Sequence, residues 1–352
     1  MRSAFSSVLD APATAQLDAL MRDAVADIRQ SSVFLADMTS YHMGWLDNDL
    51  RQLAPGRVDQ GKRIRPTLAL LSCLTCSSSV ERAFPLAAAI ELLHNFTLVH
   101  DDIQDQSRTR RHRPTVWSIW GIAQAINVGD ALFAASHRVL LRSTSFGVDH
   151  ETVVALATRF DRMTIDIVGG QVIDLQFESG APVSQDDYLA MIARKTAAIL
   201  DYGAWSGAIV GGASPEVAAS FARLGKAIGL GFQLRDDMLG VWGTGAQTGK
   251  PEADDIRRKK QSLPVVLLRQ VADSAELKIL ATLYAKNEID DDGVRQVLAL
   301  LDRHLIRNKA QAMVETQHRY AELVLGRLGD HCDARGIAGL SNLVEALSTR
   351  QH

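Results

Sequence analysis

The chain has 352 residues, of which 47% are apolar and 6% aromatic, with nine prolines and a formal net charge of -3. This length allows one large helical domain or two smaller ones, and the low aromatic and proline content is typical of a helical protein. The charge provides no global basic surface, so we expect no nucleic-acid partner and expect anions to bind only at local basic clusters.

The first residues lack the apolar run of a signal peptide, and no segment has the length and hydropathy of a membrane span. The cysteines, Cys73, Cys76 and Cys332, indicate a reducing compartment without a disulfide framework. Cys73 and Cys76 are interpreted as small core residues of a helix rather than as half of a zinc site. These features predict a cytoplasmic protein with no transmembrane segment.

Helical patterns follow one another along the chain, without strand-like alternation of any length. Pro66 and Pro85 each stand near the first position of a predicted helix, and Ser184 and Ser214 are predicted N-caps. Further helices are predicted near residues 263–286, 291–328 and 335–349. Because we find no repeat and no Pro-rich or Gly/Ser linker, the sequence predicts a single all-α domain over residues 1–352.

The stretch HDDIQDQSRTRRHRP, residues 100–114, places three carboxylates immediately before four guanidinium groups. Asp101 and Asp105 are four residues apart, so they project from one face of a helix, with Asp102 beside them. One interpretation is a solvated helix end whose charges pair with one another. The other is that the carboxylates hold divalent cations while the arginines hold an anion that the same cations bind.

A second acidic pair, Asp236 and Asp237, is predicted to end a helix that begins near Pro215, and Lys250 and Lys260 follow it. Two helices that each end in paired carboxylates and lead into basic residues predict two halves of one metal–anion site. Oxygen ligands without an accompanying set of His and Cys favour Mg²⁺ over zinc. Magnesium is often bound by a few carboxylates together with phosphate oxygens. The neighbouring Arg and Lys would then bind the same phosphate groups.

From about Gly61 to Pro264, seven motifs resemble those of the trans-isoprenyl diphosphate synthase (polyprenyl synthetase) family, in the family's order. They are GKRIRP (61–66), ELLHNFTLVHDDIQD (91–105), the arginines at 110 and 111, GGQVIDL (169–175), RKTAAIL (194–200), GFQLRDD (231–237) and the lysines at 250 and 260. The resemblance implies the all-α isoprenoid synthase fold, a helical bundle with a central active-site cavity. It also implies a homodimer.

The resemblance implies a magnesium-dependent prenyltransferase that condenses isopentenyl diphosphate with an allylic diphosphate. The implied magnesium ligands are Asp101, Asp102, Asp105, Asp236 and Asp237. The allylic diphosphate would be clamped by Arg110, Lys195 and Lys250, with Lys260 nearby. Isopentenyl diphosphate would be held by Lys62, Arg65, His94 and Arg111. Thr196 and Gln233 would line the reacting end of the allylic substrate.

Product length is predicted to be set near Phe96 and Thr97, because the hydrocarbon tail must run away from the magnesium along the helix that ends at Asp101. A single aromatic residue at the fifth position before the acidic motif resembles synthases of C20 products. We therefore predict geranylgeranyl diphosphate as the product, with a farnesyl (C15) or longer-chain synthase as the alternative. It remains open whether Phe96 is instead a core residue and another helix limits the product.

Four further polar residues and three departures from the family's pattern complete the sequence interpretation. Arg108 and Arg113 are taken as surface or rim charges. Gln171 and Asp174 are taken as either helix–helix hydrogen-bonding partners or site residues. The family often has Asp where this chain has Gly240. His112 and Trp117 likewise stand where Gly and His are frequent.

Two rival functions are less consistent with the sequence. A terpene cyclase requires Ser or Thr and then Glu in its second metal motif, where this chain has Gly240 and Thr244. A non-catalytic partner subunit is expected to lose ligands, whereas the first acidic motif and the basic set are intact.

Overall fold

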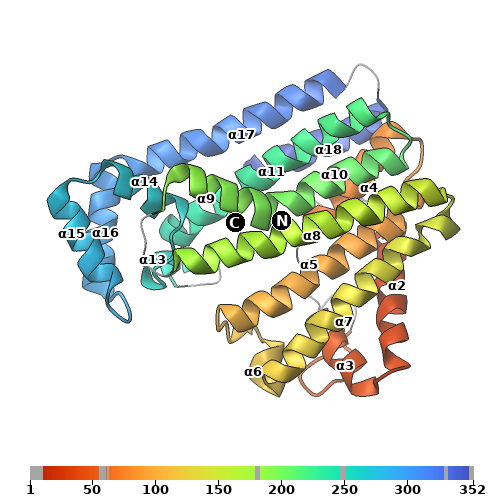
Figure 1. The fold of residues 1–352 in the computed structure, drawn as a ribbon, viewed down its shortest axis with the longest axis horizontal. Helices are drawn as coiled ribbons and strands as arrows, with labels where there is room; N and C mark the ends of the chain where they lie inside the picture. Colours follow the sequence, from red (N-terminus) through yellow and green to blue (C-terminus); the bar gives the residue numbers. More distant parts are fainter. Residues whose placement is uncertain are drawn as a thin grey trace. The chain divides into compact units, whose positions relative to one another are not determined.

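The computed structural model of the chain describes residues 11–54, 61, 63–178, 183–245, 251–328 and 332–348. In these ranges almost all regular structure is helical, and the strands are a pair of two residues each, β1 (Thr109–Arg110) and β2 (Arg113–Pro114) (Figure 1). The predicted all-α fold is confirmed. None of the described helices is both long and apolar enough to cross a membrane.

The described chain divides into two compact units. The first contains the chain up to Phe160 together with Gly203–Phe221 and Leu328–Leu343, and the second contains Asp161–Tyr202, Ala222–Arg327 and the chain from Val344. The helices α8 (His150–Phe177), α10 (Ala198–Val210) and α11 (Pro215–Trp242) contribute residues to both units. A single domain over residues 1–352 stays a prediction.

The first unit is organised around α5, whose first half is buried on all sides. Leu86, Ile90 and Leu93 are fully buried, as expected of a helix that is apolar around its whole circumference. Pro85 stands in its first turn, as predicted. The elements of this unit include α2 (Ala11–Arg29), α3 (Val33–His42), α4 (Ile64–Cys76), η1 (Glu81–Ala83), α5 (Phe84–Gln104), β1, β2, α6 (Val116–Trp120), α7 (Ile122–Leu141) and η2 (Arg142–Phe146). Figure 1 shows α7 alongside α5.

The second unit has its own apolar core, in which Leu234, Ile256, Val266 and Leu301 are fully buried. Its elements include α9 (Gln185–Ile192), the π-helical turn η3 (Ala193–Ala197), α13 (Asp254–Arg257), α14 (Leu263–Val271), α15 (Ser274–Tyr284), α16 (Asp291–Arg303) and α17 (Ile306–Leu328), while α18 (Ala334–Ser348) contributes to both units. Ser184 caps α9 as predicted, because its hydroxyl accepts a hydrogen bond from the backbone N–H of Asp187.

Two of the predicted helices, 263–286 and 291–328, are each divided in two. Asp273 accepts hydrogen bonds from the N–H groups of Ala275 and Glu276 and so begins a new helix, α15, with a capping box. At the second break, Leu305 has a φ of 53°, a left-handed conformation that interrupts the helix. The predictions were wrong at these points because an apolar repeat continues across both breaks.

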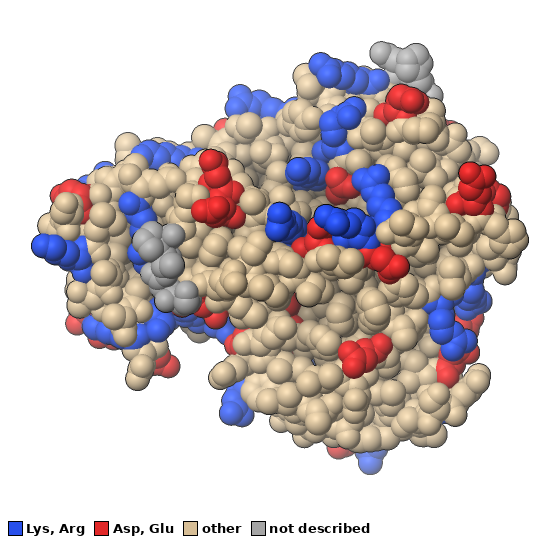
Figure 2. Space-filling model, viewed as in Figure 1, with Lys and Arg blue, Asp and Glu red and all other residues tan. Residues whose placement is uncertain are grey.

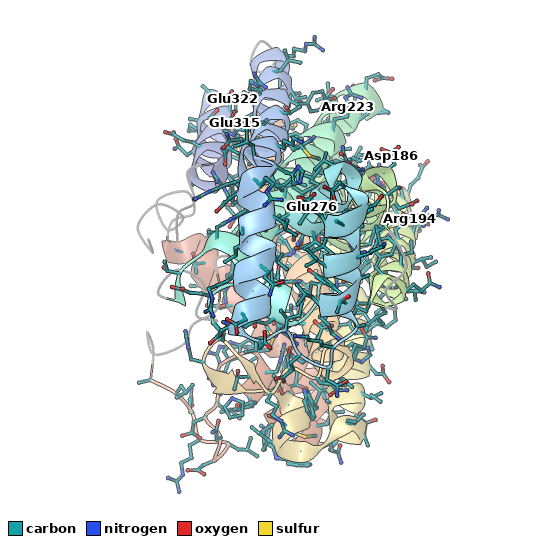
Figure 3. All side chains as sticks on the ribbon, turned by 90° about the vertical axis from the view of Figure 1, so that its left-hand side faces the viewer. Asp186, Arg194, Arg223, Glu276, Glu315 and Glu322 are labelled. Carbon is teal, nitrogen blue, oxygen red and sulfur yellow. The ribbon has the colours of Figure 1, made fainter. Side chains whose placement is uncertain are left out.

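The buried carboxylate of Glu276, labelled in Figure 3, ties α15 to the end of α16. Arg303 Nη1 donates to Glu276 Oε1, and His304 Nε2 lies 2.8 Å from Glu276 Oε2. On the face shown in Figure 2, basic and acidic side chains are interspersed over a largely uncharged surface.

Candidate active site

The end of α5 presents Asp101 and Asp105 together. The backbone N–H of Asp105 donates to the carbonyl of Asp101 at 2.8 Å, so helical geometry continues through Asp105 although α5 ends at Gln104. Both side chains are half-buried. Their spacing of four residues therefore places the two carboxylates on one face, as predicted.

Asp102 has different surroundings from its neighbours. Its side chain is buried and accepts a hydrogen bond of 2.9 Å from Arg110 Nε. Burial raises the pKa of the Asp102 carboxyl to about 6, and the Arg110 guanidinium limits the rise. Asp102 thus holds Arg110, the residue of β1 predicted to bind the allylic diphosphate, against the end of α5.

The basic residues predicted to bind isopentenyl diphosphate gather in the first unit. The Arg111 guanidinium packs on Gly61, where a Cβ would stand 2.7 Å from Arg111 Nη2 and where φ is +69°. Burial lowers the pKa of His94 well below its usual value, and the charges of Arg65, Arg111 and Arg110 lower it further. Lys62, the fourth predicted residue, lies outside the described residues.

A cleft of the first unit is lined by several of these residues and by the end of α3. Its walls include Tyr41, His42, Asn95, Asp102, Arg110 and Arg111. Burial lowers the pKa of His42 to about 3, helped by the charges of Arg110 and Arg111. Tyr41 closes the wall by donating from its hydroxyl to the carbonyl of Pro114 at 2.7 Å. No sequence motif points to Tyr41 or His42, because both precede the first motif.

The loop after the acidic helix is held in place by Arg113 and Trp117. Arg113 is half-buried at the cleft: it donates to the carbonyl of Leu46 at 2.6 Å, and its guanidinium lies 4.2 Å from the centre of the Tyr41 ring. Trp117 Nε1 donates to the carbonyl of Ser107 at 2.9 Å. Trp117 therefore has a clear structural function where the family often has His.

Phe96 begins a row of aromatic rings in the first unit. Its ring centre lies 4.8 Å from that of His100 and 5.3 Å from that of Phe133 on α7. Phe133 in turn lies 4.6 Å from His137. The Thr97 hydroxyl donates to the carbonyl of His94 within the same helix. Phe96 is therefore backed by further rings and is the more sterically demanding of the two predicted residues.

In the second unit, the π-helical turn brings Lys195 and Thr196 to acidic and amide partners. Lys195 Nζ donates to Asp174 Oδ2 at 2.5 Å. The Thr196 hydroxyl donates to Gln233 Oε1 at 2.8 Å, and Gln233 Nε2 donates to Asp237 Oδ1 at 2.8 Å. The structure thus joins Thr196 and Gln233, the pair predicted to face the reacting carbon. Single π turns are frequent at functional sites of helices.

Asp236 and Asp237 differ in burial, as Asp101 and Asp102 do. Asp236 is exposed, whereas Asp237 is buried and also accepts from the Tyr188 hydroxyl at 2.6 Å and the Leu263 N–H at 2.8 Å. Burial raises the pKa of Asp237, while these hydrogen bonds oppose the rise. Tyr188 carries no motif that the sequence analysis detects.

The helix that carries this pair is longer than predicted. Helix α11 continues to Trp242 rather than ending at Asp237, because Met238 and Val241 extend its buried face. Lys260 is half-buried after α13, and Lys250 lies outside the described residues.

The structure shows the surroundings of Gln171 and Asp174, which the sequence leaves as either helix–helix hydrogen-bonding partners or site residues. Asp174 pairs with Lys195, as above. Gln171 is buried, and neither its amide oxygen nor its amide nitrogen has a hydrogen-bond partner within the described residues. The described residues therefore offer Gln171 no helix–helix hydrogen bond, and a role of Gln171 in the site stays a prediction.

Comparisons with known proteins identify the family of the chain. A profile of the family described as Polyprenyl synthetase matches residues 48–301. The chain is 40% identical to a geranylgeranyl diphosphate synthase of Mycobacterium tuberculosis, over 76% of this chain and 74% of that protein. It is 38% identical to a (2E,6E)-farnesyl diphosphate synthase of Mycobacterium bovis, over 75% and 72%. The crystal structure of a polyprenyl synthetase from Streptomyces coelicolor A3(2) matches with a TM-score of 0.86 and 31% identity, covering 97% of this chain and 99% of that one.

The chain belongs to the polyprenyl synthetase family, as the motif series predicts. It is accordingly an enzyme, a trans-prenyltransferase of the short-chain isoprenyl diphosphate synthase class.

Proposed function

We propose that this enzyme condenses isopentenyl diphosphate with an allylic diphosphate to form a short-chain all-trans prenyl diphosphate, with geranylgeranyl diphosphate as the main product. The observation that carries the proposal is the gathering of Arg65, Arg110 and Arg111 about His94, next to the carboxylate-bearing end of α5. Guanidinium groups bind diphosphate oxygens in pairs, and the carboxylates beside them supply the charge that a bridging cation requires.

We assign the diphosphates to separate clamps. Arg110, Lys195 and Lys250 bind the allylic diphosphate, with Lys260 nearby, and Lys62, Arg65, His94 and Arg111 bind isopentenyl diphosphate. The position of Arg111 against Gly61 supports the second assignment, since it brings the arginine to the start of the first basic motif. The bond between Lys195 and Asp174 supports a role of that carboxylate in orienting the ammonium group.

The acidic residues fit magnesium. All the proposed donors are carboxylate oxygens, the ligands that this ion prefers. Within the described ranges, no three His, Cys, Asp or Glu side chains gather closely enough to hold an ion by themselves. Magnesium commonly binds one or two carboxylates and completes its shell with water and substrate phosphate. We assign Asp101, Asp105 and Asp236 as ligands. The hydrogen bonds of Asp102 and Asp237 support assisting roles through Arg110 and Gln233.

The protein groups account for the chemistry around the reacting carbon. Bound Mg²⁺ would neutralise diphosphate charge as the allylic C–O bond breaks. The Arg and Lys clamps hold the departing diphosphate, and Thr196 and Gln233 present oxygen dipoles to the developing allylic cation. The double bond of isopentenyl diphosphate then attacks this cation, and a proton is lost to the departing diphosphate.

Product length is proposed to be limited at Phe96. The relatives do not decide it, since one is named a geranylgeranyl and another a farnesyl diphosphate synthase at similar identity. Support comes from the packing of Phe96 on Phe133, which resists displacement by a growing hydrocarbon chain.

A cytoplasmic homodimer is proposed as the working form. Ile122, Ile126 and Phe133 form an exposed apolar stripe along α7, which a second copy of the chain would cover. Ile126→Glu is expected to shift the mass measured by light scattering from dimer to monomer. An unchanged mass would remove this surface from consideration.

The proposed function is tested by incubating the purified protein with isopentenyl diphosphate, an allylic diphosphate and Mg²⁺ and identifying the products by mass. We expect linear C20 diphosphate. A cyclic hydrocarbon would identify a terpene cyclase, and absence of turnover by folded protein would identify a non-catalytic subunit.

A further inference from the structure

The end of α3 is fastened to the two-stranded hairpin that carries Arg110. The Tyr41 hydroxyl donates to the carbonyl of Pro114 at 2.7 Å, and Arg113 Nη1 donates to the carbonyl of Tyr41 at 3.3 Å. Arg113 and Pro114 form β2, in which Arg113 is the register partner of Arg110 on β1. Because His42 follows Tyr41 directly, these contacts hold His42 at the wall of the cleft that Arg110 also lines.

Two buried side chains of α5 determine which nitrogen of His42 carries the proton. Asn95 Nδ2 donates to the backbone carbonyl of Glu91 at 2.8 Å and to Glu91 Oε1 at 3.4 Å. Because the amide nitrogen is occupied, the amide oxygen of Asn95 is the atom that accepts from the His42 ring. His42 Nε2 has no hydrogen-bond partner within the described residues, so the donor to Asn95 is Nδ1. The proton therefore lies on Nδ1, and Nε2 is an acceptor.

This acceptor is a buried atom beside cationic groups. His42 Nε2 is shielded from solvent, and His42 lines the same cleft as Arg110 and Arg111. Burial, followed by the charges of these two arginines, lowers the pKa of His42 to about 3, so the ring is neutral and Nε2 keeps its lone pair. A buried acceptor without a donor costs free energy, and a phenyl ring would fill the same space without that cost. Packing alone therefore does not explain a histidine here.

Arg110 is the cation best placed to donate to His42 Nε2. Among the charges that act on His42, that of Arg110 has the largest effect, followed by that of Arg111. Arg110 Nε donates to Asp102 Oδ1 at 2.9 Å, which orients the side chain and leaves its terminal N–H groups for other acceptors. Arg113 is less suitable, because both of its terminal nitrogens donate to backbone carbonyls.

We propose that His42 is a positioning residue of the allylic diphosphate clamp: in the substrate complex, its Nε2 accepts an N–H of Arg110 and orients the guanidinium towards the diphosphate. The inference rests on the proposed function, in which Arg110 binds the allylic diphosphate. Hydrogen bonds of a functional site are often long before the substrate binds and shorten in the complex. Asp102 and His42 then hold the guanidinium at two places, and its remaining N–H groups bind the diphosphate oxygens.

Three substitutions of His42 distinguish this role from packing. In His42→Gln, the amide oxygen can reach the position of Nε2 and accept the same hydrogen bond. His42→Phe keeps the size of the ring without an acceptor, and the side chain in His42→Asn is too short to reach Arg110. If His42 only fills space, His42→Phe should be the mildest of the three. If His42 positions Arg110, His42→Gln should be the mildest.

The test measures KM for geranyl diphosphate and for isopentenyl diphosphate, with the full chain and Mg²⁺, by varying each substrate in turn. His42→Phe and His42→Asn are expected to raise KM for geranyl diphosphate about tenfold, the effect of one hydrogen bond to a charged group, with little change for isopentenyl diphosphate. His42→Gln should stay close to the wild type. His318→Phe is the matched control, since it replaces a half-buried histidine of α17 that pairs with Glu322, and should leave both constants unchanged.

Arg110→Ala separates the inference from the proposed function. If Arg110→Ala raises KM for geranyl diphosphate and His42→Phe does not, the inference is wrong and the clamp stands. If Arg110→Ala leaves this KM unchanged, the assignment of the clamp is wrong, and the inference with it. Equal increases for both substrates in His42→Phe, or no rescue by His42→Gln, would also overturn the inference.

The double variant of His42→Phe with Arg110→Ala tests whether His42 acts through Arg110. Its KM for geranyl diphosphate should equal that of Arg110→Ala alone, because the group that His42 orients is already absent. Additive effects would contradict the inference. Thermal unfolding establishes that each variant is folded, and His42→Asn decides if His42→Phe does not fold.

Discussion

Thr196 and Gln233 are joined by a hydrogen bond of 2.8 Å, in which the Thr196 hydroxyl donates to the amide oxygen of Gln233. The nitrogen of the same amide donates to Asp237. Since Thr196 lies in the π-helical turn and Gln233 on α11, the bond links two elements that carry site residues. The amide is held at both ends, so its orientation is fixed before substrate arrives.

Thr196→Val should therefore lower kcat by about tenfold, because it removes one hydrogen bond to a half-buried amide, a loss of about 1–2 kcal/mol, and lets Gln233 reorient. KM for both substrates should change little, since neither diphosphate clamp is touched. Steady-state kinetics check this. Thr75→Val, which removes a buried hydroxyl bonded to the Leu71 carbonyl, is the control. An unaltered kcat in Thr196→Val would mean that the pair has no catalytic role.

Asp101→Ala or Asp236→Ala should reduce turnover by at least about a hundredfold, because each removes a metal-binding carboxylate. Neither side chain is buried, so the helical fold should remain. Product formation from labelled isopentenyl diphosphate measures activity, and circular dichroism measures helicity. The exposed Asp302→Ala serves as the control. Near-normal rates in either variant would contradict the metal assignment.

Arg111→Ala should raise KM for isopentenyl diphosphate more than KM for the allylic substrate, because the two clamps serve different anions. Lys250→Ala should have the opposite selectivity. Initial rates with each substrate varied in turn give both constants. Arg108→Ala, which removes an exposed guanidinium of the same loop, is the control. Equal effects on both substrates would refute the division of roles.

Phe96→Ala should extend the product beyond C20. One helical turn advances about 5.4 Å, comparable to one extended isoprene unit, so removal of the ring opens room for at least one more condensation. Chromatography of the dephosphorylated products reports chain length. Phe34→Ala, an exposed aromatic of α3, is the control. An active variant with unchanged products would place the limit elsewhere.

Stability should fall as the pH falls from 6.5 towards 3, in part because of His42. Its pKa is about 3 in the fold and about 6.5 in the unfolded chain, so in this window only the unfolded chain takes up the proton. The contribution of His42 to the free energy of unfolding is fully present above pH 6.5. Below this pH it is lost at up to about 1.4 kcal/mol per pH unit. Urea unfolding at pH 7 and 5 measures it. His42→Gln should show a smaller decrease than the wild type, and equal decreases would exclude His42 as a cause.

The helical class and the family could be predicted from the sequence, because the first depends on local residue patterns and the second on the order of the motifs. The candidate site residues come from the same motifs, and their roles stay predictions. Asp101 and Asp105 share a face for the reason that any two helical residues four apart do. Thr196 and Gln233 were paired by the motif series, and the structure joins them directly.

The remaining features depend on contacts between distant segments, which spacing does not encode. Nothing within the DD pairs indicates that Asp102 and Asp237 are turned inward while Asp101 and Asp236 are not. Their partners, Arg110 for one and Tyr188 for the other, come from different elements.

The residues at the end of α3 determine how far the N-terminus of this enzyme can be truncated. Tyr41 and His42 precede residue 48, where the family match begins, yet both line the cleft that contains Arg110 and Arg111. A fragment trimmed to the matched residues would retain every motif and lose one wall of that cleft, including the bond from Tyr41 to Pro114. Because the proposed diphosphate clamp forms part of this cleft, we expect a truncation at these boundaries to bind diphosphate more weakly although it keeps every motif.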